Sequence, residues 1–125
     1  MANPNLVNVT SIFGKTVFED NISSSDTEFL QNASSSNKLL KINSLIIANI
    51  NGSASATITI QIRTGNGTGI LSTLAHTVTV PADGAFVAIS KDTPIYLEED
   101  RAIYTDASAS GNLSATCSYD EIDDA

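Results

Sequence analysis

The sequence contains few of the residue types from which small proteins build covalent staples and reactive sites. Its 125 residues include one cysteine, one histidine and no tryptophan. A single cysteine excludes an internal disulfide framework, and one histidine cannot supply the two or more imidazole ligands of a usual zinc site. We therefore predict that Cys117 is a small core residue and that His76 has a structural or surface role. No catalytic residue, cofactor or metal site is predicted.

Basic residues are also scarce. Six Lys and Arg face fourteen Asp and Glu, which gives a net charge of −8, although only 16% of residues are charged. Nucleic-acid binding and attraction to anionic membranes both need clustered Lys and Arg, so neither partner is expected. Residues 98–125 contain eight of the fourteen acids, with Arg101 as their one base. This distribution predicts a nearly neutral body and an acidic C-terminal tail.

The acidic groups at 98–100 and 120–124 allow two functional alternatives. Carboxylates are suitable ligands for Ca²⁺, but neither group has the spacing of a known calcium loop, so a solvated turn and tail are favoured. A pair of glycosidase carboxylates is disfavoured because the chain has little aromatic surface on which a sugar could stack.

Long apolar runs are absent as well. The N-terminus lacks the basic and apolar regions of a signal peptide, and no apolar run approaches the ~18 residues of a membrane span. The length of 125 residues fits one domain with its own core. We expect a soluble protein that is made in the cytoplasm.

Period-two alternation is the clearest pattern in the chain. Apolar and polar residues alternate over 56–63, 76–80 and 113–119, as expected for half-buried strands. Asn51-Gly52 and Asp83-Gly84 predict hairpins between neighbouring strands. The predicted strands lie near 6–10, 15–19, 39–50, 54–63, 70–75, 76–80, 86–90, 95–97, 101–107 and 113–119. Short strands, frequent turns and no helices predict an all-β fold, an antiparallel β-sandwich of jelly-roll or Ig-like type, in a single domain.

Two further segments bear on the organisation of the chain. The glycine-rich stretch 65–69 is similar to a phosphate-binding loop, but it lacks the Lys-Ser/Thr ending, so it is predicted to be a hairpin tip. Residues 1–37 are the least regular third, with serine-rich loops around Phe29-Leu30. We predict an irregular N-terminal arm with edge strands over 1–37, and a β-sandwich core with the acidic tail over 38–125.

The predicted strand at 39–50 is apolar on both sides at its middle. Leu40, Ile42 and Ile46 share one face, whereas Leu45 and Ile47 fall on the other. Either a loop of the same chain covers that second side, or it is a subunit contact. On the second interpretation the interface candidates are Leu45 and Ile47, together with Leu6 and Val7 in the N-terminal arm.

Three segments together resemble a known group of proteins. They are MANPNLV at 1–7, SNKLLKINSLIIANI at 36–50, and the stretch 94–122 with its terminal Ser118-Tyr119-Asp120-Glu121-Ile122 motif. This set resembles small virion structural proteins of tailed bacteriophages, particularly cyanophages, over most of residues 36–122.

The resemblance implies a non-enzymatic protein of the phage particle. Its expected role is a capsid decoration (cement) protein that binds the major capsid protein or another virion protein and stabilises the head. The group implies a homo-oligomer, with a trimer favoured, on the capsid surface. The alternative is a structural or receptor-binding module of the tail, neck or fibre.

Overall fold

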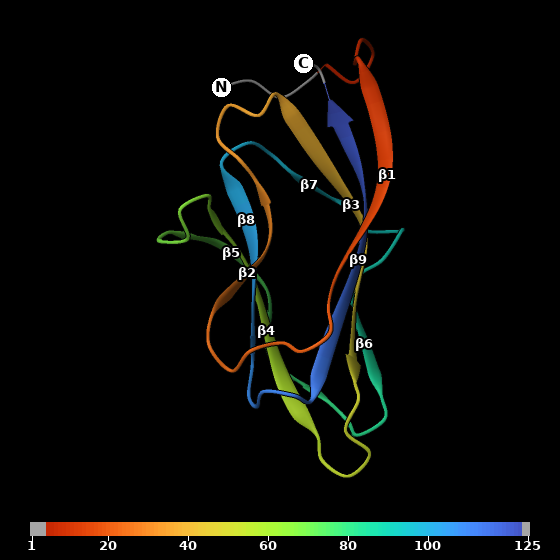
Figure 1. Ribbon diagram of the computed structural model, residues 1–125, viewed down its shortest axis with the longest axis vertical. Coiled ribbons are helices and arrows are strands. Elements are labelled where there is room, and N and C mark those ends of the chain that lie inside the picture. The colour runs from red at the N-terminus through yellow and green to blue at the C-terminus, as the bar shows by residue number, and fades with distance from the viewer. Residues whose placement is uncertain (1–4, 124–125) are drawn as a thin grey trace.

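A computed structural model describes residues 5–123, and this span is all-β, without a helix (Figure 1). The strands are β1 (Ser11–Glu19), β2 (Thr27–Asn32), β3 (Lys38–Asn49), β4 (Ala56–Thr64), β5 (Ile70–Val80), β6 (Ala85–Ile89), β7 (Ile95–Leu97), β8 (Arg101–Ala107) and β9 (Leu113–Asp123). The first sheet has the order β1-β9-β3-β6, with β7 also paired to β3, and the second has the order β2-β8-β4-β5. No helix in the described part of the chain is therefore available to cross a membrane.

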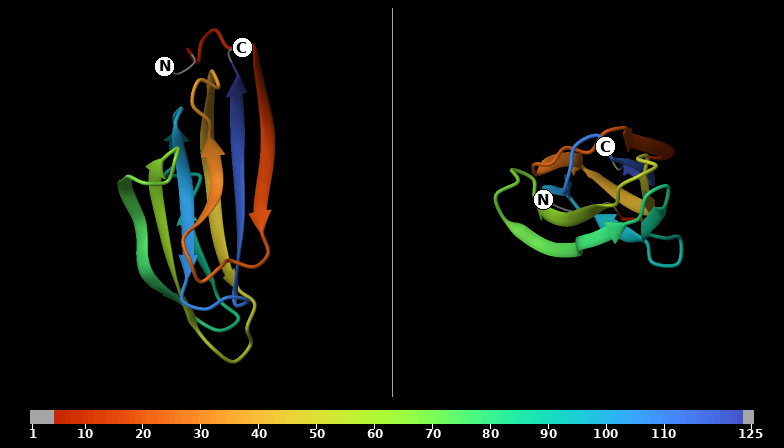
Figure 2. Two further views of the ribbon diagram at one scale, coloured as in Figure 1. Left: turned by 60° about the vertical axis from the view of Figure 1, so that its left-hand side comes forward. Right: turned by 90° about the horizontal axis from the view of Figure 1, so that it is seen from below.

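The strands pair in a nested order. β1 pairs with β9, β2 with β8, β3 with both β6 and β7, and β4 with β5, all antiparallel. The chain is thus one long hairpin whose successive strands are wrapped into two facing sheets (Figure 2). This is the topology of a jelly roll. The predicted antiparallel β-sandwich is confirmed.

The turn signals correctly predicted where the chain reverses direction. They did not predict which sheet the strand after each turn joins. Asn51-Gly52 and Asp83-Gly84 do not close hairpins, because β3 and β6 belong to the first sheet whereas β4 and β5 belong to the second. The glycine-rich stretch 65–69 does join two paired strands, β4 and β5. Gly67 has a positive φ of 81° there, and a Cβ at this position would collide with the Tyr104 side chain.

The core lies between the two sheets and is built from alternate residues of each strand. The alternation predicted for β4 and β9 is confirmed, because Ile58 and Ile60 face Leu113, Ala115 and Cys117 across the core. The other fully buried large apolar side chains are Ile22, Ile42, Leu45, Ile47, Val80, Ile89, Leu97 and Ile103. The sandwich therefore has one continuous core.

A β-bulge in β3 corrects the predicted faces of this strand. Ile42 pairs with Tyr119 and Ser44 with Ser118, so Asn43 is an extra residue without its own partner. An inserted residue reverses the alternation beyond it. Leu45 and Ile47 are consequently fully buried within their own chain. Their prediction as interface residues is wrong, and the outward residue between them is Ile46.

The two ends of the chain also differ from the sequence-based expectation. Residues 6–10, predicted as a strand, form none. Residues 27–32, which include the predicted short segment Phe29-Leu30 between serine-rich loops, form β2. β1 and β2 are edge strands of different sheets. The acidic residues 120–123 belong to β9 rather than to a tail, and 124–125 lie outside the described residues.

Candidate functional site

The outward side of the first sheet carries a line of exposed side chains, apolar except for one threonine, which we call the apolar row. The strand register places Phe18 of β1 beside Thr116 of β9, Thr116 beside Ile46 of β3, and Ile46 beside Val87 of β6. Phe18 is 72% exposed, Ile46 39% and Val87 55%. The row therefore crosses the whole width of the sheet and remains in contact with solvent in the single chain.

Small neutral side chains surround the apolar row. On one side, Thr16 of β1 lies opposite Ser118 of β9, which in turn lies opposite Ser44 of β3. On the other side, Ala48 of β3 lies opposite Ala85 of β6. Short side chains lose little conformational entropy when they are covered. We call this outward side of β1, β9, β3 and β6 the outer face of the first sheet.

Charge is almost absent from this outer face. Among the outward side chains of its four strands only Lys41 and Asp120 are charged, and the register puts them directly opposite each other. A partner can therefore cover the face without leaving an unbalanced charge away from water, which would be costly.

The outward side of the second sheet is different in character. The Arg63 guanidinium carbon lies 4.8 Å from the centre of the Tyr104 ring. Its Nη2 atom donates to Asp26 Oδ2 at 2.7 Å and to Gln61 Oε1 at 2.6 Å. Burial raises the pKa of the nearby Asp106 carboxyl, and the Asp26 charge adds to this. Charged and hydrogen-bonded groups thus occupy this side, so the two sides of the sandwich are chemically distinct.

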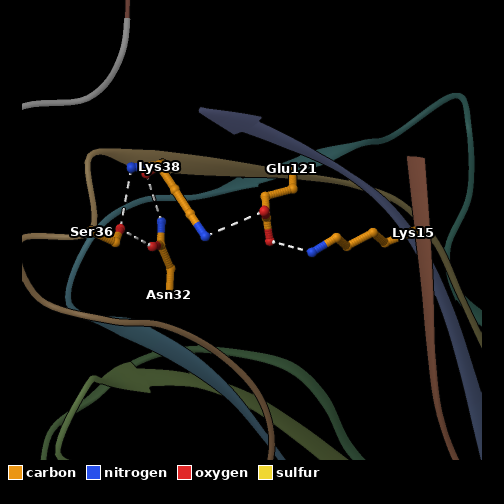
Figure 3. Close-up of polar contacts among 5 residues, drawn as sticks. All are labelled: Lys15, Asn32, Ser36, Lys38 and Glu121. Carbon is orange, nitrogen blue, oxygen red and sulfur yellow. Dashed lines mark hydrogen bonds and ion pairs between the residues drawn. The ribbon is translucent and has the colours of Figure 1, made fainter. Parts of the chain in front are cut away.

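An ion cluster fixes β1 to the rest of the first sheet (Figure 3). The Glu121 carboxylate of β9 lies 3.0 Å from Lys15 Nζ of β1 and 3.3 Å from Lys38 Nζ of β3. Partial burial disfavours the charged form of Glu121, but the hydrogen bonds from Lys15 and Lys38 outweigh it and lower the pKa of this carboxyl. The carboxylate therefore connects both strands that flank β9.

Asn32 forms a second polar junction beside this cluster (Figure 3). Its buried Nδ2 donates to the carbonyl oxygens of Lys38 and Leu97, each at 2.9 Å, and its Oδ1 accepts from Ser36 Oγ at 2.6 Å. The side chain thereby satisfies backbone carbonyls of both β3 and β7 from a strand of the other sheet. It is a structural residue that links the two sheets.

The remaining sequence-based candidates are dispersed. His76 is exposed on β5, and Cys117 is buried as predicted, with burial raising the pKa of its thiol to about 12. Glu98 Oε2 accepts a hydrogen bond from Arg101 at 2.6 Å, whereas Glu99 is buried. Residues 5–123 contain no group of three or more His, Cys, Asp or Glu arranged to hold a metal ion.

Leu6 and Val7 are exposed and lie outside the strands. Their assignment as interface residues stays a prediction. The apolar row itself was missed by the sequence reasoning. Its members lie in four strands that are distant in the chain, and only the sheet register brings them together.

Comparison with known proteins supports the fold. No family model matches the sequence, and no curated protein matches it. The chain is similar to a solved structure of Bacillus endospore appendages, described as a family of disulfide-linked pili. The TM-score is 0.57 at 13% sequence identity, and the alignment covers 100% of this chain and 96% of the other. A likeness at this identity establishes the β-sandwich fold alone.

Proposed function

We propose that this protein is a non-enzymatic structural subunit that joins a larger assembly through the outer face of the first sheet. The observation that carries the proposal is the apolar row. Three of the four strands each expose an apolar side chain in this row, with Thr116 between two of them. A gathering of exposed apolar side chains marks a contact site, and sheets pack face to face when their facing side chains can interdigitate. The polar side of the second sheet then remains toward solvent.

The assembly that we propose is the head of a tailed bacteriophage. In this proposal the protein is made in the host cytoplasm and decorates the capsid surface, where it binds the major capsid protein and stabilises the shell as an oligomer. Support comes from the resemblance over residues 36–122 and from the nearly uncharged outer face. Binding to a shell stabilises the assembled state because only that state gains the contact. A location on the tail, neck or fibre is the alternative within the same particle.

A filament subunit is a second candidate function. The observation that favours it is the likeness to the spore-appendage pilus over the full length of this chain. That pilus is described as disulfide-linked, whereas the one cysteine of this chain, Cys117, is buried. A filament of this protein would therefore be held together by noncovalent contacts.

The test compares two lysine substitutions at equally exposed positions. Val87 is 55% exposed on the outer face of the first sheet, and Ile70 is 57% exposed on β5 of the second sheet. We expect Val87→Lys to abolish binding to purified phage heads and any filament formation, whereas Ile70→Lys retains both. Equal behaviour of the two variants would contradict the assignment of the face.

The location of the protein on the phage particle can be determined directly from purified particles. Cryo-electron microscopy of purified particles, with mass spectrometry to identify the chain, distinguishes many copies on the head from a few copies at the tail. If the contact is made by the neutral face, added salt should have little effect on binding to the particle. Added ions weaken only charged contacts, which they screen over a Debye length of ~10 Å at 0.1 M. Release from the particle by high salt would instead indicate a contact made by the acidic residues.

A further inference from the structure

The four sheet edges of this protein are not equally protected against pairing with another chain. β5 has three register shifts against β4, and Thr77 within it has a φ of 46°. β2 has six residues and a register shift, β6 has five residues and a register shift, and β7 has three residues. Bulges and short strands are devices that discourage edge-to-edge pairing. β1 alone, with nine residues and an unbroken register from Ser11 to Glu19, has neither.

The sequence of β1 is nearly symmetric about its central residue, Lys15. Ile12 and Phe18 lie three residues to either side and point outward, where Ile12 is 58% and Phe18 72% exposed. Phe13 and Val17 lie two residues to either side on the opposite face of the strand, where Phe13 is 53% exposed and Val17 is partly buried. An antiparallel pair of two β1 strands with its two-fold axis at Lys15 therefore places Ile12 opposite Phe18, and Phe13 opposite Val17. Apolar cross-strand pairs of this kind stabilise a sheet.

Other registers lose this match. A shift by two residues keeps each side chain on its own face, but it places Lys15 opposite Phe13 in one direction and opposite Val17 in the other. A shift by one residue exchanges the inward and outward faces altogether. Only the register centred on Lys15 leaves every apolar side chain of β1 opposite another.

The central lysine would ordinarily oppose such a contact, since like charges directly opposite each other are destabilising. Each Lys15 ammonium, however, lies 3.0 Å from the Glu121 carboxylate of its own chain. Glu121 therefore places a negative charge beside each lysine at the axis and reduces the repulsion between the two lysines, although Lys38 of the same chain shares that carboxylate.

We propose that β1 pairs with β1 of a second copy of this chain, antiparallel and two-fold symmetric about Lys15, so that the first sheets of both copies form one continuous sheet. The contact is isologous, which is the usual arrangement in a homodimer. It differs from the trimer that the phage resemblance implies. The pairing does not depend on the proposed function, because the outer faces stay open in the dimer and become continuous with each other.

Sedimentation of the full chain tests the pairing. We expect the wild type to sediment with twice the 13.1 kDa mass of one chain. Ile12→Glu and Phe18→Lys should each weaken the dimer about tenfold or more, because each replaces two apolar cross-strand pairs. Ile70→Glu is the matched control, since Ile70 is 57% exposed on the protected edge strand β5. Circular dichroism establishes that each variant is folded, and either of the two β1 variants is sufficient for the comparison.

Mixing the two β1 variants tests the register. In a mixed dimer the glutamate at position 12 of one copy faces the lysine at position 18 of the other, and the second 12–18 pair is native. We expect the mixture to recover dimer that neither variant forms alone. A wild type that stays monomeric or forms a trimer, or a mixture that does not recover, overturns the proposal. Val87→Lys separates it from the proposed function, because that variant should remain dimeric while particle binding is lost.

Discussion

The alternation of buried and exposed residues in β3 makes a direct prediction for two neighbouring positions. Leu45 is fully buried in the core, whereas Ile46 is 39% exposed on the outer face. Truncation of a buried leucine loses its transfer free energy and leaves a cavity, so Leu45→Ala should lower the free energy of unfolding by about 3 kcal/mol. Ile46→Ala leaves no closed cavity and removes partly hydrated atoms, so its cost should be about 1 kcal/mol.

The difference is large enough to measure by thermal or urea unfolding. About 3 kcal/mol corresponds to a fall in Tm of roughly 10 °C for a domain of this size. Circular dichroism is the suitable signal because the chain has no tryptophan. The two variants must be compared in the same state of association. If Ile46→Ala were as destabilising as Leu45→Ala, the bulge at Asn43 would not set the faces of β3, and the apolar row would lose one of its members.

Three further predictions concern single residues. Glu121→Gln should reduce the loss of stability on acidification. Because the pKa of Glu121 is lowered in the folded protein, its ion pairs stabilise the fold above the ordinary pKa of 4.5 and are lost as the pH falls through the lower folded value. The acid unfolding curves of variant and wild type should therefore converge below that pH range and differ above it. Burial raises the pKa of the Cys117 thiol to about 12, so Cys117 should react with iodoacetamide at pH 8 far more slowly in the folded protein than in urea. Mass spectrometry follows the reaction, and equal rates in the two conditions would show that the core opens readily. Glu99 is buried with both carboxylate oxygens free of hydrogen bonds to residues 5–123, so Glu99→Met should raise the Tm, whereas a fall in Tm would reveal a stabilising interaction of the carboxylate.

Strands with unbroken alternation could be predicted from the sequence. In β4 and β9 the apolar residues recur at every second position, and both strands bury the residues that the pattern indicates. The pattern fails where the backbone departs from regular pairing. In β2 the register shifts between Glu28 and Leu30, so no simple alternation marks it as a strand. In β3 the one extra residue, Asn43, moves Leu45 and Ile47 from the predicted second face of the strand to the face that packs in the core.

The connections between strands were harder to predict for a different reason. A residue pair such as Asp83-Gly84 specifies a change of chain direction through its local backbone preferences, and Asp83 does adopt a φ of 59°. The sheet that the next strand enters depends on which face must be buried, and this is decided by contacts far apart in the chain. The candidate site has the same dependence, because the apolar row exists only once β1, β9, β3 and β6 lie side by side.

The outer face and the free edge of β1 belong to one structural unit. Phe18 contributes to both, because it is a member of the apolar row and lies on the outward side of the edge strand. Glu121 binds Lys15 from the inner side of the same strand, so the charge on β1 is compensated within the chain. The net charge of −8 is therefore not spread evenly: it lies mainly on residues outside the strands, while the strands of the second sheet carry as many bases (Arg63 and Arg101) as acids (Glu28 and Asp106). The outward surface of the first sheet is nearly neutral. A surface of this kind adds little long-range repulsion between copies, so its contacts are decided by fit and apolar burial at short range.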